Sequence, residues 1–361
     1  MKQQEKTLLN SLSRFDSKTL DDKLLEYATA HVLGQLFYNR MQGAAYGTLK
    51  KHGLLGKVNR EFRNSLAVAY EQNVIKNRSF TICVDYISQL LAAYHGRIAM
   101  LKGAVLCGLY PEGYRTSNDI DLLLHPKDVT AVGKLLQDQG FQQGSIRNGE
   151  FVPATRREII DSKINRGETV PYIKEIDLPG MRFLEVDLNF SLDYKNGEDS
   201  VLDAMLSRCI TQEVGSIQVP TLCQEDFFIH LCAHLYKEAT TLPWVQMHRD
   251  MSLYKYMDIY LLMNRMTQND AAKLFDRAKE LGMEQICAFA ILQTAELFMM
   301  EDSNVLWQAE YILRDNKAFL HQVISPQEHK IYQYQTEDIA ERFFMEDRFS
   351  DLKEVSVDET S

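Results

Sequence analysis

One short segment with two acidic residues constrains this chain more than any other stretch. Residues 117–124 read Ser-Asn-Asp-Ile-Asp-Leu-Leu-Leu. If they form a strand, Asp119 and Asp121 point to one side, with Cα atoms roughly 7 Å apart, while Ile120 and Leu122 point to the other. Two carboxylates on one face repel each other unless positive charge lies between them. The same pattern is also typical of an exposed strand edge, so neighbouring motifs must decide whether it marks a site.

Two neighbouring motifs favour a site. Lys102-Gly103 stands where a short apolar run, residues 97–101, meets an expected helix over residues 104–109. Backbone N–H groups at a helix N-terminus bind phosphate, glycine permits a close approach, and Lys102 adds positive charge. Downstream, Asp187 lies in an alternating strand-like segment. Three carboxylates beside such a turn suit Mg²⁺, which prefers oxygen ligands, and predict a two-metal phosphoryl-transfer site.

The periodicity of apolar residues divides the chain into helical, mixed and again helical stretches, with no fixed-period repeat. The sequence predicts an α+β fold with a small mixed sheet at its core and helical regions on both sides. The expected ranges are an N-terminal helical region (1–89), the α/β core (90–222), a C-terminal helical region (223–349) and a disordered acidic tail (350–361).

Charge and composition exclude several classes of protein. The 361 residues include 40 Lys and Arg against 50 Asp and Glu, and this acidic balance disfavours a general nucleic-acid binder. Residues 1–80 nevertheless carry thirteen basic and seven acidic side chains. This excess indicates either solvated helix faces or a basic surface for an anionic partner.

The cysteines and the hydropathy pattern indicate the compartment. Six cysteines lack any Cys-x-x-Cys or zinc spacing, so we expect reduced thiols. No apolar run approaches the ~18 residues of a membrane helix, and the first residues do not read as a signal peptide. These features predict a cytoplasmic protein without a membrane partner.

Together these motifs resemble the nucleotidyltransferase superfamily with the DNA polymerase β-like fold, and within it an uncharacterised bacterial nucleotidyltransferase family. The resemblance covers about residues 20–265. It rests on the Leu101–Ala104 turn, Tyr110-Pro111, Arg115, the Asp119–Leu124 strand, Gly140-Phe141 and Asp187, with weaker matches at Ala30-His31, Leu36–Tyr38, Leu231–His234 and Lys255–Ile259.

The resemblance implies an enzyme that moves a nucleoside monophosphate from an NTP, such as ATP, to a hydroxyl group and releases pyrophosphate. Asp119, Asp121 and Asp187 would be the catalytic residues and would hold two Mg²⁺ ions. Asp187 would complete the second metal site or take the proton of the acceptor hydroxyl, and both roles stay open.

The resemblance also implies a set of nucleotide-binding residues: Lys102, Gly103, Ala104, Arg115, Ser117 and Lys255. Arg115 would clamp the triphosphate or form a surface salt bridge, and Ser117 would contact phosphate or shape the turn. Two positions depart from the superfamily pattern, because Ala104 replaces a second Gly or Ser and Asn189 stands where relatives often have His. His230 and His234 share a helix face, and a core role fits them better than metal binding.

The acceptor and two rival functions remain open at this stage. The acceptor could be a small molecule, or a protein modified as in toxin–antitoxin systems. The chain could also be a catalytically silent nucleotide-binding scaffold. Retention of three acids together argues against the silent form, since unused carboxylates on one face are costly.

Overall fold

The computed structural model describes residues 1–165, 167–192 and 199–355. It divides into two compact units, one made of residues 71–227 and the other of residues 1–70 with 228–361. The first boundary falls inside the continuous helix α4 (Arg60–Ala92), not at the expected residue 90, because the second half of that helix packs with the sheet. Each unit is described separately below.

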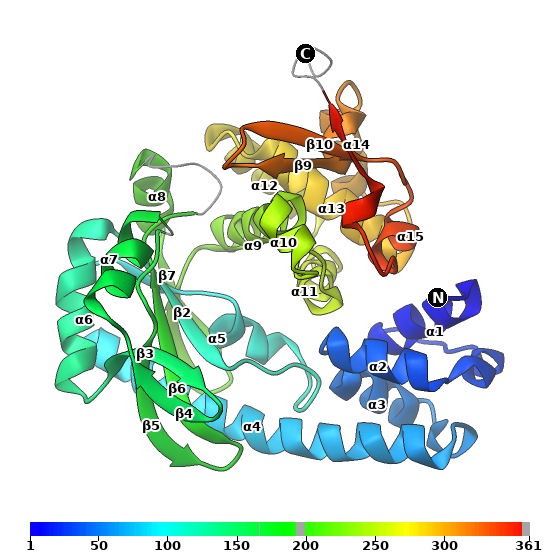
Figure 1. Ribbon diagram of the computed structural model, residues 1–361, viewed down its shortest axis with the longest axis horizontal. Coiled ribbons are helices and arrows are strands. Elements are labelled where there is room, and N and C mark those ends of the chain that lie inside the picture. Colours follow the sequence, from blue (N-terminus) through cyan, green and yellow to red (C-terminus); the bar gives the residue numbers. More distant parts are fainter. Residues whose placement is uncertain (166, 193–198, 356–361) are drawn as a thin grey trace. The chain divides into compact units, whose positions relative to one another are not determined.

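The unit 71–227 is built on a six-stranded mixed sheet with the order β1-β2-β6-β5-β3-β4 (Figure 1). Strands β2 and β6 are parallel, and the other neighbours are antiparallel. The strands are β1 (Ile98–Met100), β2 (Asp119–Leu124), β6 (Met181–Asn189), β5 (Tyr172–Leu178), β3 (Gln142–Arg147) and β4 (Glu150–Pro153). The α+β class and the mixed sheet predicted from the sequence are therefore confirmed.

Strand β2 lies between the edge strand β1 and its parallel neighbour β6. Ile120 and Leu122 are fully buried, as their alternation with the two aspartates predicts. The parallel ladder sets Asp121 opposite Asp187 and Leu122 opposite Leu188. Apolar residues of the two strands therefore pack together on one side, while the acids of both strands lie on the same opposite side.

Helices hold the sheet through both side-chain packing and polar contacts. From α4, the Ser79 hydroxyl donates to the Pro179 carbonyl at 2.7 Å and Ser88 contacts the Met100 sulfur at 3.7 Å. Helix α6 (Val129–Asp138) ends shortly before Gly140, whose φ of +86° suits glycine. The unit also contains α5 (Gly103–Leu106), η3 (Cys107–Leu109), η4 (Pro126–Asp128), α7 (Arg156–Asn165), α8 (Asp199–Leu206), β7 (Ile210–Val214) and β8 (Ile217–Thr221).

Helix α7 lies in a polar stretch, residues 141–180, whose sequence predicts only hairpin and loop. Its apolar residues Ile160 and Ile164 are exposed, so the helix lacks the buried stripe that periodicity reveals. The expected turn at residues 195–197 lies outside the described residues.

The other unit is mainly helical and joins the two ends of the chain. Asn10 donates to the Leu297 carbonyl at 2.8 Å, and the Leu253 N–H donates to Asn39 at 3.0 Å. The two helical regions therefore fold together, as the sequence allowed. Their helices are α1 (Gln3–Ser13), η1 (Asp22–Tyr27), α2 (Ala30–Tyr38), α3 (Gln42–Lys51), η2 (Leu55–Lys57), α9 (Gln224–Thr240), α10 (Leu242–Gln246), α11 (Leu253–Met263), α12 (Gln268–Glu280), α13 (Glu284–Phe298), α14 (Asn304–Leu313), η5 (Lys317–His321), α15 (Ile339–Phe343) and η6 (Phe349–Asp351).

A small antiparallel sheet corrects the prediction for the C-terminal part. Strands β9 (Gln322–Ser325), β10 (Lys330–Tyr334) and β11 (Leu352–Val355) form it, with β10 in the middle. From the sequence we expected helices up to residue 349 and a disordered tail from residue 350. Pairing with β10 orders Leu352–Val355 instead, while residues 356–361 lie outside the described residues.

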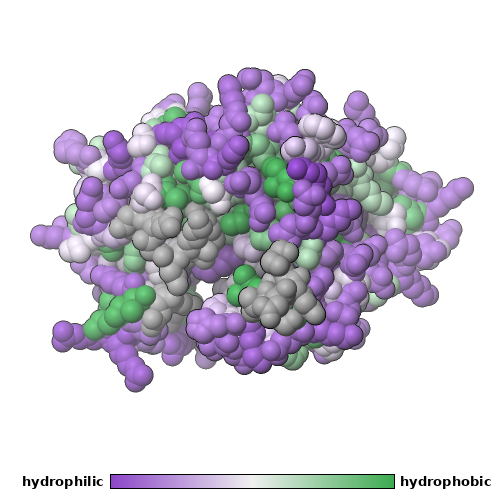
Figure 2. Space-filling view, turned by 90° about the horizontal axis from the view of Figure 1, so that it is seen from above, coloured by the Kyte–Doolittle hydropathy of each residue, from purple (hydrophilic) through white to green (hydrophobic). Residues whose placement is uncertain are grey.

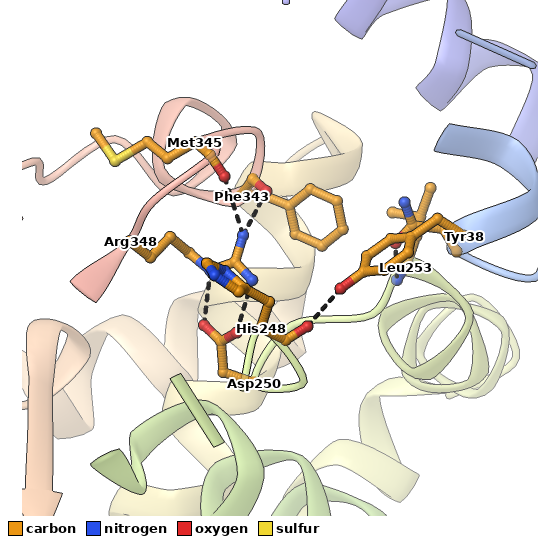
Figure 3. Close-up of polar contacts among 8 residues, drawn as sticks. Tyr38, His248, Asp250, Leu253, Phe343, Met345 and Arg348 are labelled. Atoms are coloured by element: carbon orange, nitrogen blue, oxygen red, sulfur yellow. Dashed lines mark hydrogen bonds and ion pairs between the residues drawn. The ribbon is translucent and has the colours of Figure 1, made fainter. Parts of the chain in front are cut away.

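A buried ion pair fixes the end of the chain to the helical unit (Figure 3). Arg348 donates to both carboxylate oxygens of Asp250, at 2.7 and 2.6 Å, and also to the carbonyls of Phe343 and Met345. Tyr38 donates to the His248 carbonyl beside this pair. Asp250 is therefore held by this ion pair, and Ser252 takes the N-cap position of α11.

The surface and the cysteines add two further observations. Hydrophilic residues predominate on the face shown in Figure 2, and hydrophobic ones form small separate patches there. No helix among the described residues is long and apolar enough to span a membrane. All six cysteines are free thiols, and Cys83, Cys232 and Cys287 are buried.

Candidate functional site

Parallel pairing of β2 with β6 brings the predicted acids onto neighbouring strands. Asp119 lies opposite Glu185, and Asp121 lies opposite Asp187. The Asp121 side chain is only 9% exposed. Residues directly opposite in a sheet present their side chains to the same face. The carboxylates of Asp119, Asp121 and Asp187 therefore share one face at this end of the sheet.

The crowding of these acids changes their proton affinity. Burial raises the pKa of Asp187 well above its usual range, and the charges of Asp121, Asp119 and Glu168 raise it further, while Lys102 opposes them. Burial and the charge of Asp119 likewise raise the pKa of Glu185. The site thus holds more negative charge than its own lysine neutralises, which is the electrostatic condition for binding a further cation.

Lys102 supplies positive charge from an unusual backbone position. Its ammonium lies 2.9 Å from Asp121 Oδ1. Its φ of +44° and ψ of −115° match the first central residue of a type II′ turn, where glycine is preferred. A non-glycine residue in such a sparsely populated region costs on the order of 1–3 kcal/mol. Burial lowers the pKa of Lys102, but Asp121, Asp119 and Asp187 outweigh it and raise that pKa, so the ammonium stays charged.

Gly103 follows in the same turn and makes room for the residues beside it. A Cβ at this position would lie 2.1 Å from Ser117 Oγ, a distance that real Cβ atoms do not show. Arg115 Nη1 donates to the same hydroxyl at 2.6 Å, and both side chains are buried. Three of the predicted nucleotide-binding residues therefore gather beside Lys102.

Ala104 contributes less than the sequence suggested. Its N–H donates to the Leu101 carbonyl at 3.3 Å, so the turn itself uses the donor that was assigned to phosphate. Helix α5 is only one turn long. The phosphate-binding role of Ala104 stays a prediction.

The donor set fits a metal that arrives with its substrate. Within the described part of the chain, no group of three or more His, Cys, Asp or Glu side chains is arranged as a ready metal site. Asp121 and Asp187 nevertheless offer carboxylate oxygens on paired strands. Mg²⁺ commonly takes one or two carboxylates and completes its shell with water and substrate phosphates. The residues therefore fit a shared protein–phosphate site better than a closed protein cage.

Two residues near the acids have roles that sequence reasoning did not assign. Asn189 donates to Asp121 Oδ1 at 3.4 Å, although the sequence marked this residue only as a departure from the family pattern. Glu168 forms an isolated bridge with Asn189, and its charge acts on Asp187. Glu168 lies in a polar stretch without periodicity, so only the fold reveals its position.

Lys255 belongs to the helical unit, where it forms an ion pair with Glu238. His234 approaches the same carboxylate at 3.4 Å, and His230 is buried on α9, as a core histidine would be. The assignment of Lys255 to the nucleotide stays a prediction.

Comparisons with known proteins identify the family of this chain. A family model described as "Uncharacterised nucleotidyltransferase" matches residues 22–299, a range that includes every predicted site residue. Among solved structures, an antigenic nucleotidyltransferase-like protein from Paracoccidioides brasiliensis is 15% identical, with a TM-score of 0.35 over 58% of this chain and 92% of that one. No curated protein matches the chain. The bacterial branch and the superfamily placement stay predictions, but the chain belongs to this uncharacterised family of nucleotidyltransferases.

Proposed function

We propose that this protein transfers a nucleoside monophosphate from an NTP to a hydroxyl-bearing acceptor, with Mg²⁺, and releases pyrophosphate. The observation that carries the proposal is the parallel register that sets Asp121 opposite Asp187 beside the Lys102–Gly103 turn. Family membership supports nucleotidyltransferase chemistry. The buried Arg115–Ser117 hydrogen bond beside Gly103 supports a phosphate-bearing substrate.

The acidic residues of the site would bind metal, and its basic and hydroxyl residues would bind phosphate. Asp119 and Asp121 would hold Mg²⁺, which when bound neutralises the triphosphate and its leaving group. Arg115 and Ser117 would orient phosphate oxygens, because a guanidinium matches their geometry with two parallel hydrogen bonds. Lys102 adds a positive charge beside Asp121.

Asp187 is the candidate base in this reaction. Its carboxylate lies on the strand paired with that of Asp121, so it would be the acid beside the metal that accepts the hydroxyl proton. The acceptor oxygen would attack the α-phosphorus, forming a new P–O bond, while the bond to the β-phosphate oxygen breaks and pyrophosphate leaves. The hydroxyl proton would pass to Asp187 in the same step. A role of Asp187 as metal ligand alone is the alternative.

Labelled nucleotides test the proposal directly. ATP, GTP, CTP and UTP with label at the α-phosphate would be incubated with cell extract, Mg²⁺ and either wild type or an Asp119→Ala/Asp121→Ala double variant. We expect transfer of the label by wild type, and at least a ~10³-fold loss in the double variant with an unchanged circular dichroism spectrum. Lys174→Met is the control, because it also removes a charge from this unit. The Lys174 ammonium contacts the rings of Tyr86 and Phe141 and is not among the predicted site residues.

The form of the labelled product identifies the acceptor class. Label on a protein band would place the chain among protein-modifying nucleotidyltransferases, and label only on metabolites would give a small-molecule acceptor. Transfer from the γ-phosphate instead of the α-phosphate, or equal activity in the double variant, would contradict the proposed reaction. Absence of any metal-dependent NTP binding would favour a catalytically silent scaffold.

A further inference from the structure

A cation of the chain itself already occupies the carboxylate that is proposed to bind metal. The Lys102 ammonium lies 2.9 Å from Asp121 Oδ1, and Asn189 donates to the same oxygen at 3.4 Å. The Lys102 side chain is 24% exposed and that of Asp121 is 9% exposed. The pair is thus largely shielded from water, but the lysine keeps a path to solvent.

A lysine and a metal that share Asp121 Oδ1 repel each other. A Mg²⁺–oxygen contact measures about 2.1 Å, so a metal on Asp121 Oδ1 would come within roughly 5 Å of the ammonium. Like charges at that separation repel strongly when they are shielded from water. Free Mg²⁺ must therefore compete with an ion pair that is already formed on this oxygen, and metal binding favours release of Lys102 from Asp121.

The surroundings of Lys102 offer the ammonium a second position. The residue shares its turn with Gly103, which packs directly against Ser117, and Arg115 donates to Ser117. A triphosphate bound there would present oxygens to the lysine. A glycine would fit the backbone of residue 102 without strain, so the turn alone does not require this side chain.

We propose that Lys102 is an exchange residue, which holds Asp121 while the site lacks nucleotide and transfers to the triphosphate when metal and nucleotide enter together. The inference rests on the proposed function. The exchange would weaken the binding of free divalent cations and favour the binding of a metal–nucleotide complex. Because coupling between ligands is reciprocal, nucleotide must raise the affinity for metal as much as metal raises the affinity for nucleotide.

A Lys102→Met variant separates this role from simpler ones, since methionine keeps length and removes charge. Binding of free Mn²⁺ is measured by electron paramagnetic resonance, without nucleotide. Binding of Mn²⁺ with a non-hydrolysable NTP analogue is measured by calorimetry. We expect free Mn²⁺ to bind about 10-fold more tightly to the variant and the metal–nucleotide complex about 10-fold more weakly, a change of ~1.4 kcal/mol in opposite directions.

These opposite changes identify the exchange. A lysine that only contacts phosphate would weaken nucleotide binding and leave free Mn²⁺ unaffected, and a structural lysine would change neither affinity. Both results would overturn the inference. Lys174→Met should leave both affinities unchanged, because it removes one charge from the same unit at the aromatic rings of Tyr86 and Phe141.

Two outcomes distinguish a failure of this inference from a failure of the proposed function. If wild type binds the metal–nucleotide complex but Lys102→Met does not gain affinity for Mn²⁺, the inference fails and the proposed function stands. If wild type binds no nucleotide with or without metal, the proposed function fails and the exchange fails with it. Should Lys102→Met not fold, Lys102→Gly removes the same ammonium and relieves the backbone, so it must show the same tighter binding of Mn²⁺.

Discussion

Two buried carboxylates in this molecule each face a cation, and their surroundings differ sharply. Asp250 accepts two hydrogen bonds from Arg348, and both side chains are at most 6% exposed. Asp121 receives one ammonium from Lys102, whose backbone is strained, and it shares that charge with other acids. The charges of Asp250 and Arg348 balance each other. The acids around Lys102 carry more negative charge than its single ammonium neutralises.

The difference separates a structural ion pair from a site. Arg348 also donates to two carbonyls, so its guanidinium has little capacity left for a ligand. The acids around Lys102 instead repel each other, and burial together with this repulsion raises the pKa of Asp187. A buried group that stays unfavourable in the free protein can gain free energy when a ligand arrives, which is why such groups mark candidate sites.

The largest expected effect comes from the same substitution made in both pairs. Asp250→Asn leaves the buried Arg348 charge without a carboxylate partner, and we expect a loss of about 3–5 kcal/mol in the free energy of unfolding. Asp121→Asn removes one of several competing negative charges, and Lys102 keeps Asp119 and Asp187 nearby. Its effect on stability should therefore stay below about 1 kcal/mol. Urea denaturation of both variants measures the difference.

Nucleotide binding should show the reverse order for these two variants. We expect Asp121→Asn to lose metal-dependent nucleotide binding, while folded Asp250→Asn retains it. Equal destabilisation by both substitutions would mean that Asp121 and Lys102 form an ordinary structural pair, and the contrast between the two regions would be lost.

The next effect concerns the turn beside the acids. Gly103→Ala places a Cβ 2.1 Å from Ser117 Oγ, so the Arg115–Ser117 contact must shift. We expect a loss of roughly 1–3 kcal/mol in stability from this overpacking, together with weaker nucleotide binding. Thermal unfolding and calorimetry measure the two effects.

Gly34 provides a matched control for that substitution. An added Cβ there meets nothing within 4 Å in helix α2, so Gly34→Ala should stabilise the protein by about 0.5–1 kcal/mol. Unchanged nucleotide binding in Gly103→Ala would show that the close packing at Ser117 serves the fold and not the ligand.

The sequence predicted those parts of the site that depend on local alternation. The two-residue spacing of Asp119 and Asp121 and the apolar residues between them place the acids on one face of a strand, as the structure shows. The glycine at position 103 likewise signals a close approach. Local physics suffices here, because the strand period determines which side each residue faces.

Long-range pairing accounts for what local spacing does not determine, although the family resemblance implied that Asp187 joins Asp119 and Asp121. Asp121 meets Asp187 only because β2 and β6 pair in parallel, and the approach of Glu168 to Asp187 depends on a bridge with Asn189. The partner of Asp250 is far along the chain at Arg348. No periodicity in the sequence connects such residues. Helix α7 could not be predicted either, because its isoleucines are exposed and form no apolar stripe.

The smallest expected effect is a pH dependence that reports the crowding of the acids. The pKa of Asp187 is raised in the folded chain, so the folded state binds this proton more tightly than the unfolded chain does. The stabilisation is fully present below the ordinary aspartate pKa of about 4 and is lost as the pH rises through the raised pKa. Asp187→Asn stays neutral at every pH, so in the absence of metal it should be more stable than wild type at neutral pH. The difference should vanish towards pH 4.

Asp270 gives a control of opposite sign for that measurement. Hydrogen bonds from the backbone and hydroxyl of Thr267 lower the pKa of Asp270, so its contribution is present above the ordinary pKa and is lost as the pH falls. Asp270→Asn should therefore be less stable than wild type at neutral pH, where Asp187→Asn is more stable. Urea unfolding between pH 4 and pH 8 with a chelator present compares the two variants. Parallel stability curves for wild type and Asp187→Asn would show that the acids of β2 and β6 do not repel each other, and the contrast with Asp250 would then rest on geometry alone.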